Sequence, residues 1–274
     1  MVDLFREIRR VLRDDGTVWL NLGDSYAGAP GGFQGRNGQR ATRTFTARMQ
    51  HRKEGAGLKP KDLIGIPWRV ALALQADGWW LRQDIIWSKP NPMPESVTDR
   101  CTKSHEYIFL FSKLDRYYYD IDAVREPNSP ESLARQQRGR SENHKWADGG
   151  PGGQTLATDI SGACHPLGRN RRSVWNIATA PFSGAHFATM PPAVAEPCIL
   201  AGCPKGGVVL DPFGGAGTTG LVAERLERNA ILLELNPDYC QIATDRIRAD
   251  LGRVQTNLSA TQKDSGPLFA DAAD

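Results

Sequence analysis

Two acidic residues and a run of glycines in the C-terminal third have the types and spacing of a nucleotide-binding site. The β-branched run 208–211 precedes Gly215, Gly217 and Gly220, which satisfy the pattern G-x-G-x-x-G. Such glycines permit a tight turn and close approach of a ligand to the backbone at a helix start. Glu234 follows nineteen residues after Gly215, where a carboxylate can accept hydrogen bonds from ribose hydroxyls. The pattern predicts a site for an adenosine-containing cofactor, with a purely structural glycine turn as the other interpretation.

The residue before the loop separates two classes of cofactor. In a dinucleotide site the glycines follow the strand directly, because the pyrophosphate needs unobstructed N–H groups. Here Asp211 stands between strand and loop, and a carboxylate would repel a pyrophosphate. The ammonium and sulfonium groups of S-adenosylmethionine are cations, so the charge favours that cofactor. A P-loop is excluded, because no Lys-Ser or Lys-Thr pair follows the glycines.

The elements that must position this loop alternate as in an α/β fold. Hydrophobic periodicity predicts helices over 3–13, 64–75, 191–200, 217–227 and 237–251, and strands over 17–22, 80–88, 107–112, 207–211 and 230–234. The stretches 27–60 and 123–172 have neither period and are interpreted as a long loop and an inserted segment. The resulting division is 1–122, 123–172 and 173–254, followed by a polar tail, 255–274, that we expect to be disordered.

Composition narrows the class of protein. The 274 residues include 28 glycines and 18 prolines, which excludes a helical bundle or coiled coil. No run of eighteen apolar residues occurs, so we expect no membrane span. Five cysteines without a dense framework indicate a reduced, cytoplasmic protein. The net charge of +3 hides a basic segment, 31–61, with eight Lys or Arg and one acid, which fits either a polyanion-binding loop or a solvated one.

Several segments together resemble the DNA amino-methyltransferases, which methylate adenine N6 or cytosine N4. They are Asp211-Pro-Phe-Gly-Gly-Ala-Gly-Thr-Thr-Gly220 and Leu233-Glu-Leu-Asn-Pro-Asp-Tyr239 for the cofactor motifs, residues 7–25, 81–95 and 105–113 upstream, and His186-Phe-Ala-Thr-Met-Pro191. Their order is similar to that of the β-type enzymes, with the cofactor half last. The resemblance implies a Rossmann-like, circularly permuted methyltransferase sheet, S-adenosylmethionine as cofactor, double-stranded DNA as partner, and a role in restriction-modification.

The resemblance also assigns residues to the two ligands. The cofactor contacts it implies are Asp211, Phe213, Gly215, Gly217, Thr218, Glu234, Phe187 and Ala188. Core packing is the other interpretation of Phe213, and Asn236 is equally suited to cap the helix that begins at Pro237. The segment 123–172 would be the target-recognition region, with His144 and Trp146 either probing a base or anchoring a small core. The DNA-backbone contacts would be Arg36, Arg40, Arg43, Arg48, Arg52 and Lys53.

The family's catalytic tetrapeptide, Asp/Asn/Ser-Pro-Pro-aromatic, does not occur in this sequence. Its family position precedes residue 1, so we name no catalytic residue and expect the N-terminal strands of the sheet to be missing. Two hypotheses stay open: a methyltransferase that needs a further N-terminal segment or second chain, and an inactive DNA- or cofactor-binding remnant or half of a split enzyme. The choice between cytosine N4 and adenine N6 leans to cytosine from overall similarity only.

The cysteines do not predict a metal site. Cys198 and Cys203 have the wrong spacing for zinc, and no metal is expected. Cys240 lies in a predicted helix, where we expect it to be a buried small apolar residue.

Overall fold

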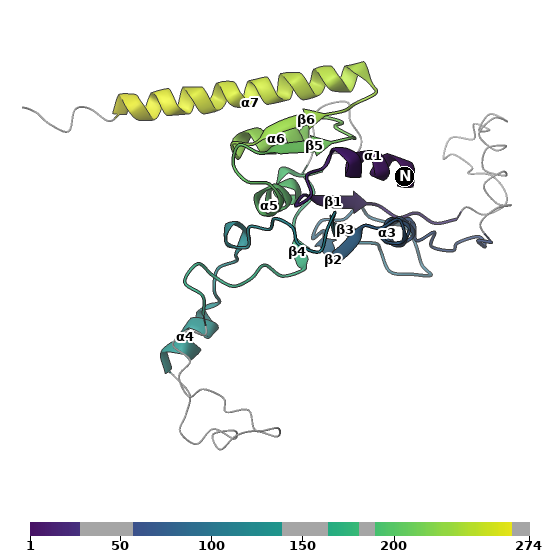
Figure 1. Cartoon of the computed structure of the whole chain (residues 1–274). Coiled ribbons are helices and arrows are strands. Elements are labelled where there is room, and N and C mark those ends of the chain that lie inside the picture. The colour runs from purple at the N-terminus through teal and green to yellow at the C-terminus, as the bar shows by residue number, and fades with distance from the viewer. Residues whose placement is uncertain (28–56, 139–163, 181–189, 265–274) are drawn as a thin grey trace, which may run out of the picture. The chain divides into compact units, whose positions relative to one another are not determined.

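The computed structural model describes residues 1–27, 57–138, 164–180 and 190–264, with side chains as far as Leu251 (Figure 1). The chain separates into two compact units, each with its own sheet. Unit 1 comprises residues 1–117 and 173–178, and unit 2 comprises residues 118–172 and 179–274. The mixture of helices and sheets confirms the predicted α/β class.

Unit 1 is built on a four-stranded sheet with the order β1-β3-β2-β4. Its elements are α1 (Val2–Val11), β1 (Thr17–Leu22), α3 (Ile66–Ala76), β2 (Trp80–Ser88), β3 (His105–Ser112) and β4 (Val174–Asn176). Strands β1 and β2 both run antiparallel to β3, and β4 runs parallel to β2. The carboxyl ends of β1, β2 and β4 therefore meet at one edge of the sheet.

The core of unit 1 lies between the sheet and helices α1 and α3. Strand β3 is central, and its residues 108–112 are all buried, which fits its continuous apolar run. Phe5 of α1 and Leu74 of α3 pack against Phe109 and Phe111 in one cluster with Trp79. This amphipathic packing explains why the helical period of 3–13 was readable from the sequence.

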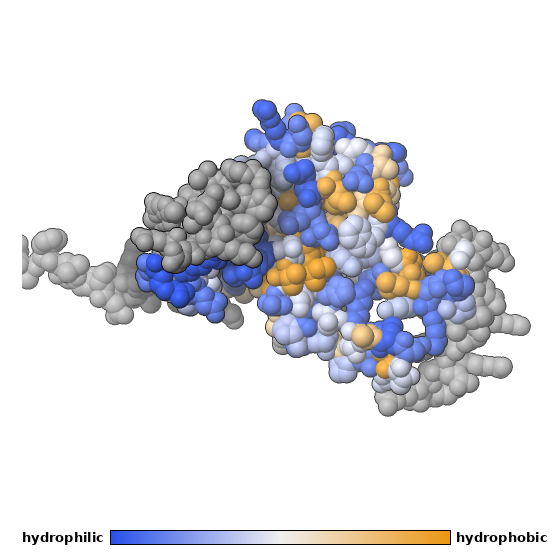
Figure 2. Space-filling view, turned by 90° about the horizontal axis from the view of Figure 1, so that it is seen from below, coloured by the Kyte–Doolittle hydropathy of each residue, from blue (hydrophilic) through white to orange (hydrophobic). Residues whose placement is uncertain are grey.

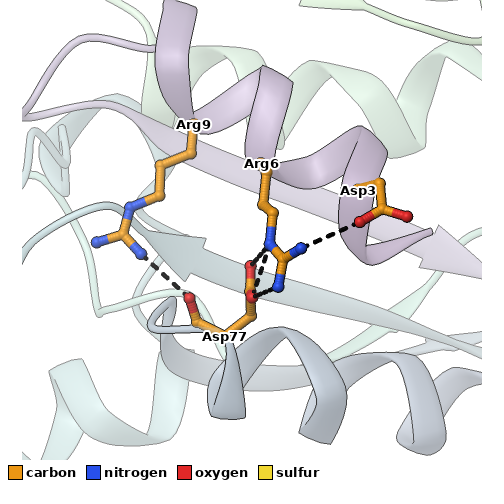
Figure 3. A network of polar contacts seen from close by, with 4 residues as sticks. All are labelled: Asp3, Arg6, Arg9 and Asp77. Atoms are coloured by element: carbon orange, nitrogen blue, oxygen red, sulfur yellow. Dashed lines mark hydrogen bonds and ion pairs between the residues drawn. The ribbon is translucent and has the colours of Figure 1, made fainter.

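A polar network fastens α1 to the end of α3 (Figure 3). Arg6 donates to the carboxylate of Asp77 from Nη2 (2.6 Å) and to Asp3 from Nη1 (3.1 Å). Arg9 donates to the Asp77 carbonyl (3.5 Å), and its guanidinium lies 5.7 Å from the Trp79 ring centroid. Arg6 is well exposed, so this network contributes orientation more than stability.

Unit 2 contains a two-stranded parallel sheet, β5-β6, joined through α6. Its elements are a 3-10 turn η1 (Asp122–Val124), α4 (Pro130–Arg138), α5 (Pro192–Gly202), β5 (Val208–Asp211), α6 (Thr218–Arg225), β6 (Asn229–Leu232) and α7 (Pro237–Asp264). Ile199 of α5 and Leu221 and Val222 of α6 form its buried cluster, against which Val209 of β5 packs.

The structure differs from the sequence prediction in three elements. Helix α7 runs to Asp264, so residues 255–264 are helical although we expected disorder from 255. No proline after Pro237 interrupts the chain as far as Asp264. Helix α4 lies within the segment interpreted as aperiodic, and the short strand β4 pairs with β2 although it belongs to the range assigned to the cofactor half.

Large apolar side chains also reach the surface of unit 1. Trp68 and Leu72 occupy one face of α3 and are exposed, as is Trp80 at the start of β2. The face seen in Figure 2 carries apolar patches between strongly hydrophilic ones. Single exposed apolar residues are ordinary on folded proteins, so Trp68, Leu72 and Trp80 need no functional explanation by themselves.

Candidate functional site

The carboxyl ends of β5 and β6 bring the two predicted acids to one edge of the unit 2 sheet. Asp211 is the last residue of β5 and pairs in register with Leu232, the last residue of β6. Glu234 follows two residues later, and the loop 212–217 leads from Asp211 into α6. Ligands of α/β sheets bind outside the carboxyl ends of the strands. The predicted residues therefore lie where such a site is expected.

The carboxylate of Asp211 closes the first part of the loop. Its Oδ1 accepts the backbone N–H of Phe213 at 3.0 Å, and its Oδ2 accepts the hydroxyl of Thr219 at 2.6 Å. The first bond is a local turn of the kind that aspartate favours, and the second ties the strand end to the first turn of α6. Asp211 thus shapes the loop as well as carrying its negative charge.

Glu234 joins the glycine loop to the segment after β6. Its Oε2 accepts the N–H of Gly215 at 2.9 Å, and its Oε1 accepts the N–H of Asn236 at 2.9 Å. The N–H of Gly214 donates to the Leu233 carbonyl at 2.8 Å. Both acids predicted from the sequence are therefore in contact with the loop backbone.

The glycines of the motif have separate reasons to be glycine. Gly215 and Gly217 adopt left-handed backbone angles, with φ of 49° and 74°. A Cβ on Gly217 would also lie 2.7 Å from the Cβ of Ala243 in α7, and one on Gly220 would lie 2.8 Å from Cδ1 of Leu232. The third glycine thus allows the close helix–strand packing expected of this motif.

Two apolar side chains stand exposed beside the acids. Phe213 has 61% of its surface exposed, which contradicts core packing as its role. Leu235, next to Glu234, is fully exposed. Leu235 was not predicted as a site residue, although its place between the end of β6 and the helix start at Pro237 is visible in the sequence.

Other predicted site residues are placed less simply. Thr218 is buried, and its hydroxyl accepts a hydrogen bond from Arg246 Nη1 at 2.9 Å. Asn236 Oδ1 accepts the N–H of Asp238 at 2.9 Å, which confirms the helix-capping interpretation. The remaining predicted residues lie outside the described ranges: Phe187, Ala188, His144, Trp146, Arg36, Arg40, Arg43, Arg48, Arg52 and Lys53.

The cysteines differ in exposure. Cys240 is exposed and its thiol lies 3.6 Å from the Glu234 carbonyl, so the expectation that it is buried was wrong. Cys240 lies in the first turn of α7, and its side chain is on the exposed side of that turn. Desolvation raises the pKa of Cys198 to about 12.

Within the described ranges, no three His, Cys, Asp or Glu side chains gather as a metal site. No helix in the same ranges has the length and apolar character needed to cross a membrane.

Unit 1 carries a polar cluster at the carboxyl ends of its own strands. Asn21 of β1 donates to the Glu106 carboxylate (3.1 Å) and to the Tyr107 carbonyl (3.0 Å). Lys89, just after β2, pairs with the same carboxylate and lies 4.4 Å from the Trp87 ring centroid. The backbone N–H of Lys89 donates to the Ser104 carbonyl (2.8 Å). These contacts fix the start of the proline-rich connector that follows Lys89.

Asp24 performs a capping role in the same unit. Its Oδ1 accepts the N–H groups of Gly65 (3.0 Å) and Ile66 (3.1 Å) at the start of α3. A carboxylate at a helix N-terminus is stabilised by the helix dipole. Asp24 therefore connects the end of β1 to the start of α3.

Comparison with known proteins places the chain in a family. The family model described as "DNA methylase" matches residues 1–245. The chain is 46% identical over 247 residues to the Type II methyltransferase M.SmaI of Serratia marcescens, covering 90% of this chain and 72% of that protein. It is 45% identical over 254 residues to M.XycI of Xanthomonas campestris pv. cyanopsidis, covering 93% and 72%.

A solved structure agrees at the level of the fold. The PvuII DNA methyltransferase (cytosine-N4-specific) aligns with a TM-score of 0.51 and 19% identity, covering 92% of this chain and 76% of that one. The family match confirms the resemblance drawn from the loop 211–220 and the segment 233–239. The chain therefore belongs to the DNA methylase family, whose members transfer a methyl group from S-adenosylmethionine to an amino group of a DNA base.

Proposed function

We propose that the edge formed by Asp211, the loop 212–217 and Glu234 is where this chain binds S-adenosylmethionine. The observation that carries the proposal is the bond from Gly215 N–H to Glu234 Oε2. It brings the acid after β6 to the glycine loop after β5, an arrangement that neither a lone glycine turn nor a lone acid would produce. The nineteen-residue spacing read from the sequence thus corresponds to a direct contact.

The residues present suit the cofactor chemically. The Glu234 carboxylate accepts backbone N–H groups from the loop and from Asn236, and a carboxylate is also a suitable acceptor for ribose hydroxyls. The negative charge of Asp211 complements the cationic ammonium and sulfonium groups. The exposed side chains of Phe213 and Leu235 offer apolar surface for the adenine ring.

The reaction we propose is methylation of an exocyclic amino group, cytosine N4 or adenine N6, in double-stranded DNA. Bound S-adenosylmethionine supplies the electrophilic methyl group. The part of unit 2 is to bind and orient the cofactor through the loop and the two acids. A base inside a duplex must be flipped out before its amino group can be reached, so DNA contacts are required from elsewhere in the chain.

The DNA contacts are assigned to two segments. We propose that the basic segment 31–61 lies on the phosphate backbone of the DNA. We further propose that the chain divides into 1–122, 123–172 and 173–254, and that residues 123–172 select the target sequence. M.SmaI and M.XycI are named Type II methyltransferases, which supports a restriction-modification role. All five cysteines are free thiols, which supports a cytoplasmic location.

The group that acts on the target amino nitrogen is proposed to come from outside residues 1–274. No Asp/Asn/Ser-Pro-Pro-aromatic tetrapeptide occurs within them. Transfer of tritium from labelled cofactor to DNA tests this directly. We expect cofactor binding but no transfer by residues 1–274 alone, and transfer once an extended or partner chain carrying the tetrapeptide is added. Transfer by residues 1–274 alone would contradict the proposal.

Calorimetry with S-adenosylmethionine tests the cofactor site. Glu234→Ala removes an acceptor of ribose and of two backbone N–H groups, and loss of a charged acceptor costs on the order of 1.5–3 kcal/mol. We expect at least about tenfold weaker binding, since 1.4 kcal/mol is a factor of ten. Glu224→Ala, an exposed glutamate of α6, is the matched control and should bind normally. Unchanged affinity of Glu234→Ala would remove Glu234 from the site.

A further inference from the structure

We infer that Arg246 of α7 is a positioning residue that holds the glycine loop from behind while making no contact with the cofactor itself. The inference rests on the proposed function of the loop as the S-adenosylmethionine site. It adds a residue that neither the glycine motif nor the acids would identify, because Arg246 lies thirty positions after Ala216 in the sequence.

The contacts of Arg246 reach the turn between the loop and α6. Its Nη1 donates to the Ala216 carbonyl at 3.1 Å and to the Thr218 hydroxyl at 2.9 Å. Ala216 and Thr218 are both buried, with 4% and 6% of their surface exposed. One guanidinium nitrogen thus bridges the residues on either side of Gly217.

Helix α7 also packs against the turn at Gly217. Ala243 lies three residues before Arg246, on the same helix face, and is the neighbour that a Cβ on Gly217 would meet at 2.7 Å. Glu234 holds Gly215 from the side of the strand ends. The loop is therefore held by charged side chains of opposite sign, the acids Asp211 and Glu234 at the strand ends and an arginine from α7.

The position is electrostatically unfavourable for a cation. Desolvation lowers the pKa of Arg246, the nearby Arg225 lowers it further, and Asp250 opposes the shift. The start of α6 at Thr218 adds the positive end of a helix dipole. An apolar side chain would fill this place without that electrostatic cost. What the guanidinium provides in return is directed hydrogen bonds to a loop whose backbone must be held in one shape.

The inference predicts a specific pattern of cofactor affinity. In calorimetry with S-adenosylmethionine on the full chain, Arg246→Gln should bind about tenfold more weakly than wild type, since hydrogen bonds to a charged group are lost. Arg248→Gln is the matched control, because Arg248 is exposed on the same helix, and it should bind like wild type. The binding stoichiometry should stay unchanged in both, since a displaced loop lowers affinity while an unfolded fraction lowers stoichiometry.

Chemical rescue distinguishes positioning from general support of the fold. Arg246→Ala leaves space for a free guanidinium ion, so guanidinium chloride below the unfolding range should restore much of its affinity. Arg246→Lys keeps the positive charge but replaces the planar guanidinium by an ammonium group. Its cofactor affinity should lie between those of wild type and Arg246→Gln. If Arg246→Gln loses its fold, Arg246→Lys and Arg246→Ala still test the inference. The inference would be overturned if Arg246→Lys bound the cofactor with wild-type affinity and guanidinium did not restore the affinity of Arg246→Ala.

The outcomes separate this inference from the proposed function. Wild-type affinity in Arg246→Gln, with wild type binding the cofactor, would overturn the role of Arg246 and leave the site intact. Absence of binding by wild type would overturn the cofactor site and the inference with it. Weaker binding at constant stoichiometry, restored by guanidinium, would support both.

Discussion

Replacing Gly217 by alanine tests whether the loop and α7 are packed as tightly as the structure indicates. Gly217 has φ of 74°, a region in which a Cβ costs roughly 1–2 kcal/mol. Its added Cβ would lie 2.7 Å from the Cβ and 3.1 Å from the Cα of Ala243. The Cα belongs to the backbone of α7 and cannot rotate away, so the helix or the loop must shift.

Gly206 supplies a control that isolates the packing contribution. It has the same φ of 74°, yet a Cβ there would meet no atom within 4 Å. Gly206→Ala should therefore cost only the backbone penalty of roughly 1–2 kcal/mol. Gly217→Ala adds overpacking, which typically costs about 1–3 kcal/mol, so we expect a total loss of about 2–5 kcal/mol.

Urea unfolding followed by circular dichroism measures both variants, compared through their midpoints at equal slope. Gly217→Ala should unfold at clearly lower urea than Gly206→Ala, and it alone should weaken S-adenosylmethionine binding in calorimetry. Equal losses of stability in the two variants would refute the close approach of α7. Normal cofactor affinity in a folded Gly217→Ala protein would refute the argument that loop shape determines binding.

Two further predictions concern the basic segment and the cysteines. Deleting residues 31–56 should flatten the log–log dependence of DNA affinity on salt, which would approach about −7 if all eight basic residues of 31–61 met phosphates; an unchanged slope in DNA titrations would exclude contact. Because desolvation raises the pKa of the Cys198 thiol to about 12, iodoacetamide at mildly alkaline pH should label the exposed Cys101 and Cys240 first, and equal labelling by mass spectrometry would contradict the raised pKa. An unperturbed thiol has a pKa of about 8.5, so the contribution of Cys198 to stability is fully present below that pH and is lost as the pH rises from there to about 12.

The sequence was sufficient for elements whose signal is local. The strands Thr17–Leu22 and Trp80–Ser88 were predicted with the bounds that the structure shows, because the first ends at Gly23-Asp24 and the second at the proline-rich connector after Lys89. The helix predicted over 64–75 is confirmed as α3, and Pro67 lies in its first turn, where the missing N–H costs nothing. Asp211 and Glu234 could be predicted as site residues because the ends of the strands and the spacing from the glycines can both be read from the sequence.

Elements and contacts that depend on distant partners could not be read in this way. The three-residue strand β4 has no period of its own and exists because it pairs with β2, 88 residues away in the register Ile86 to Val174. Arg246 looks like any surface arginine of an amphipathic helix until the loop is placed against it. Leu235 and Cys240 were misjudged or missed because exposure depends on what covers a position, which the sequence does not state.

The glycine motif illustrates why spacing alone is weak evidence for a cofactor site and why the folded loop is stronger. Each glycine has its own reason to be glycine: Gly215 has a left-handed backbone angle, Gly217 also approaches Ala243 of α7, and Gly220 approaches Leu232 of β6, while Glu234 binds the Gly215 N–H. These partners lie outside the motif, so the same pattern in another sequence would not acquire the same shape. A purely structural glycine turn would need none of these contacts. Their convergence on one loop is the physical reason for our proposal that 211–220 binds the cofactor, and it predicts that substitutions in α7 alter the shape of the loop.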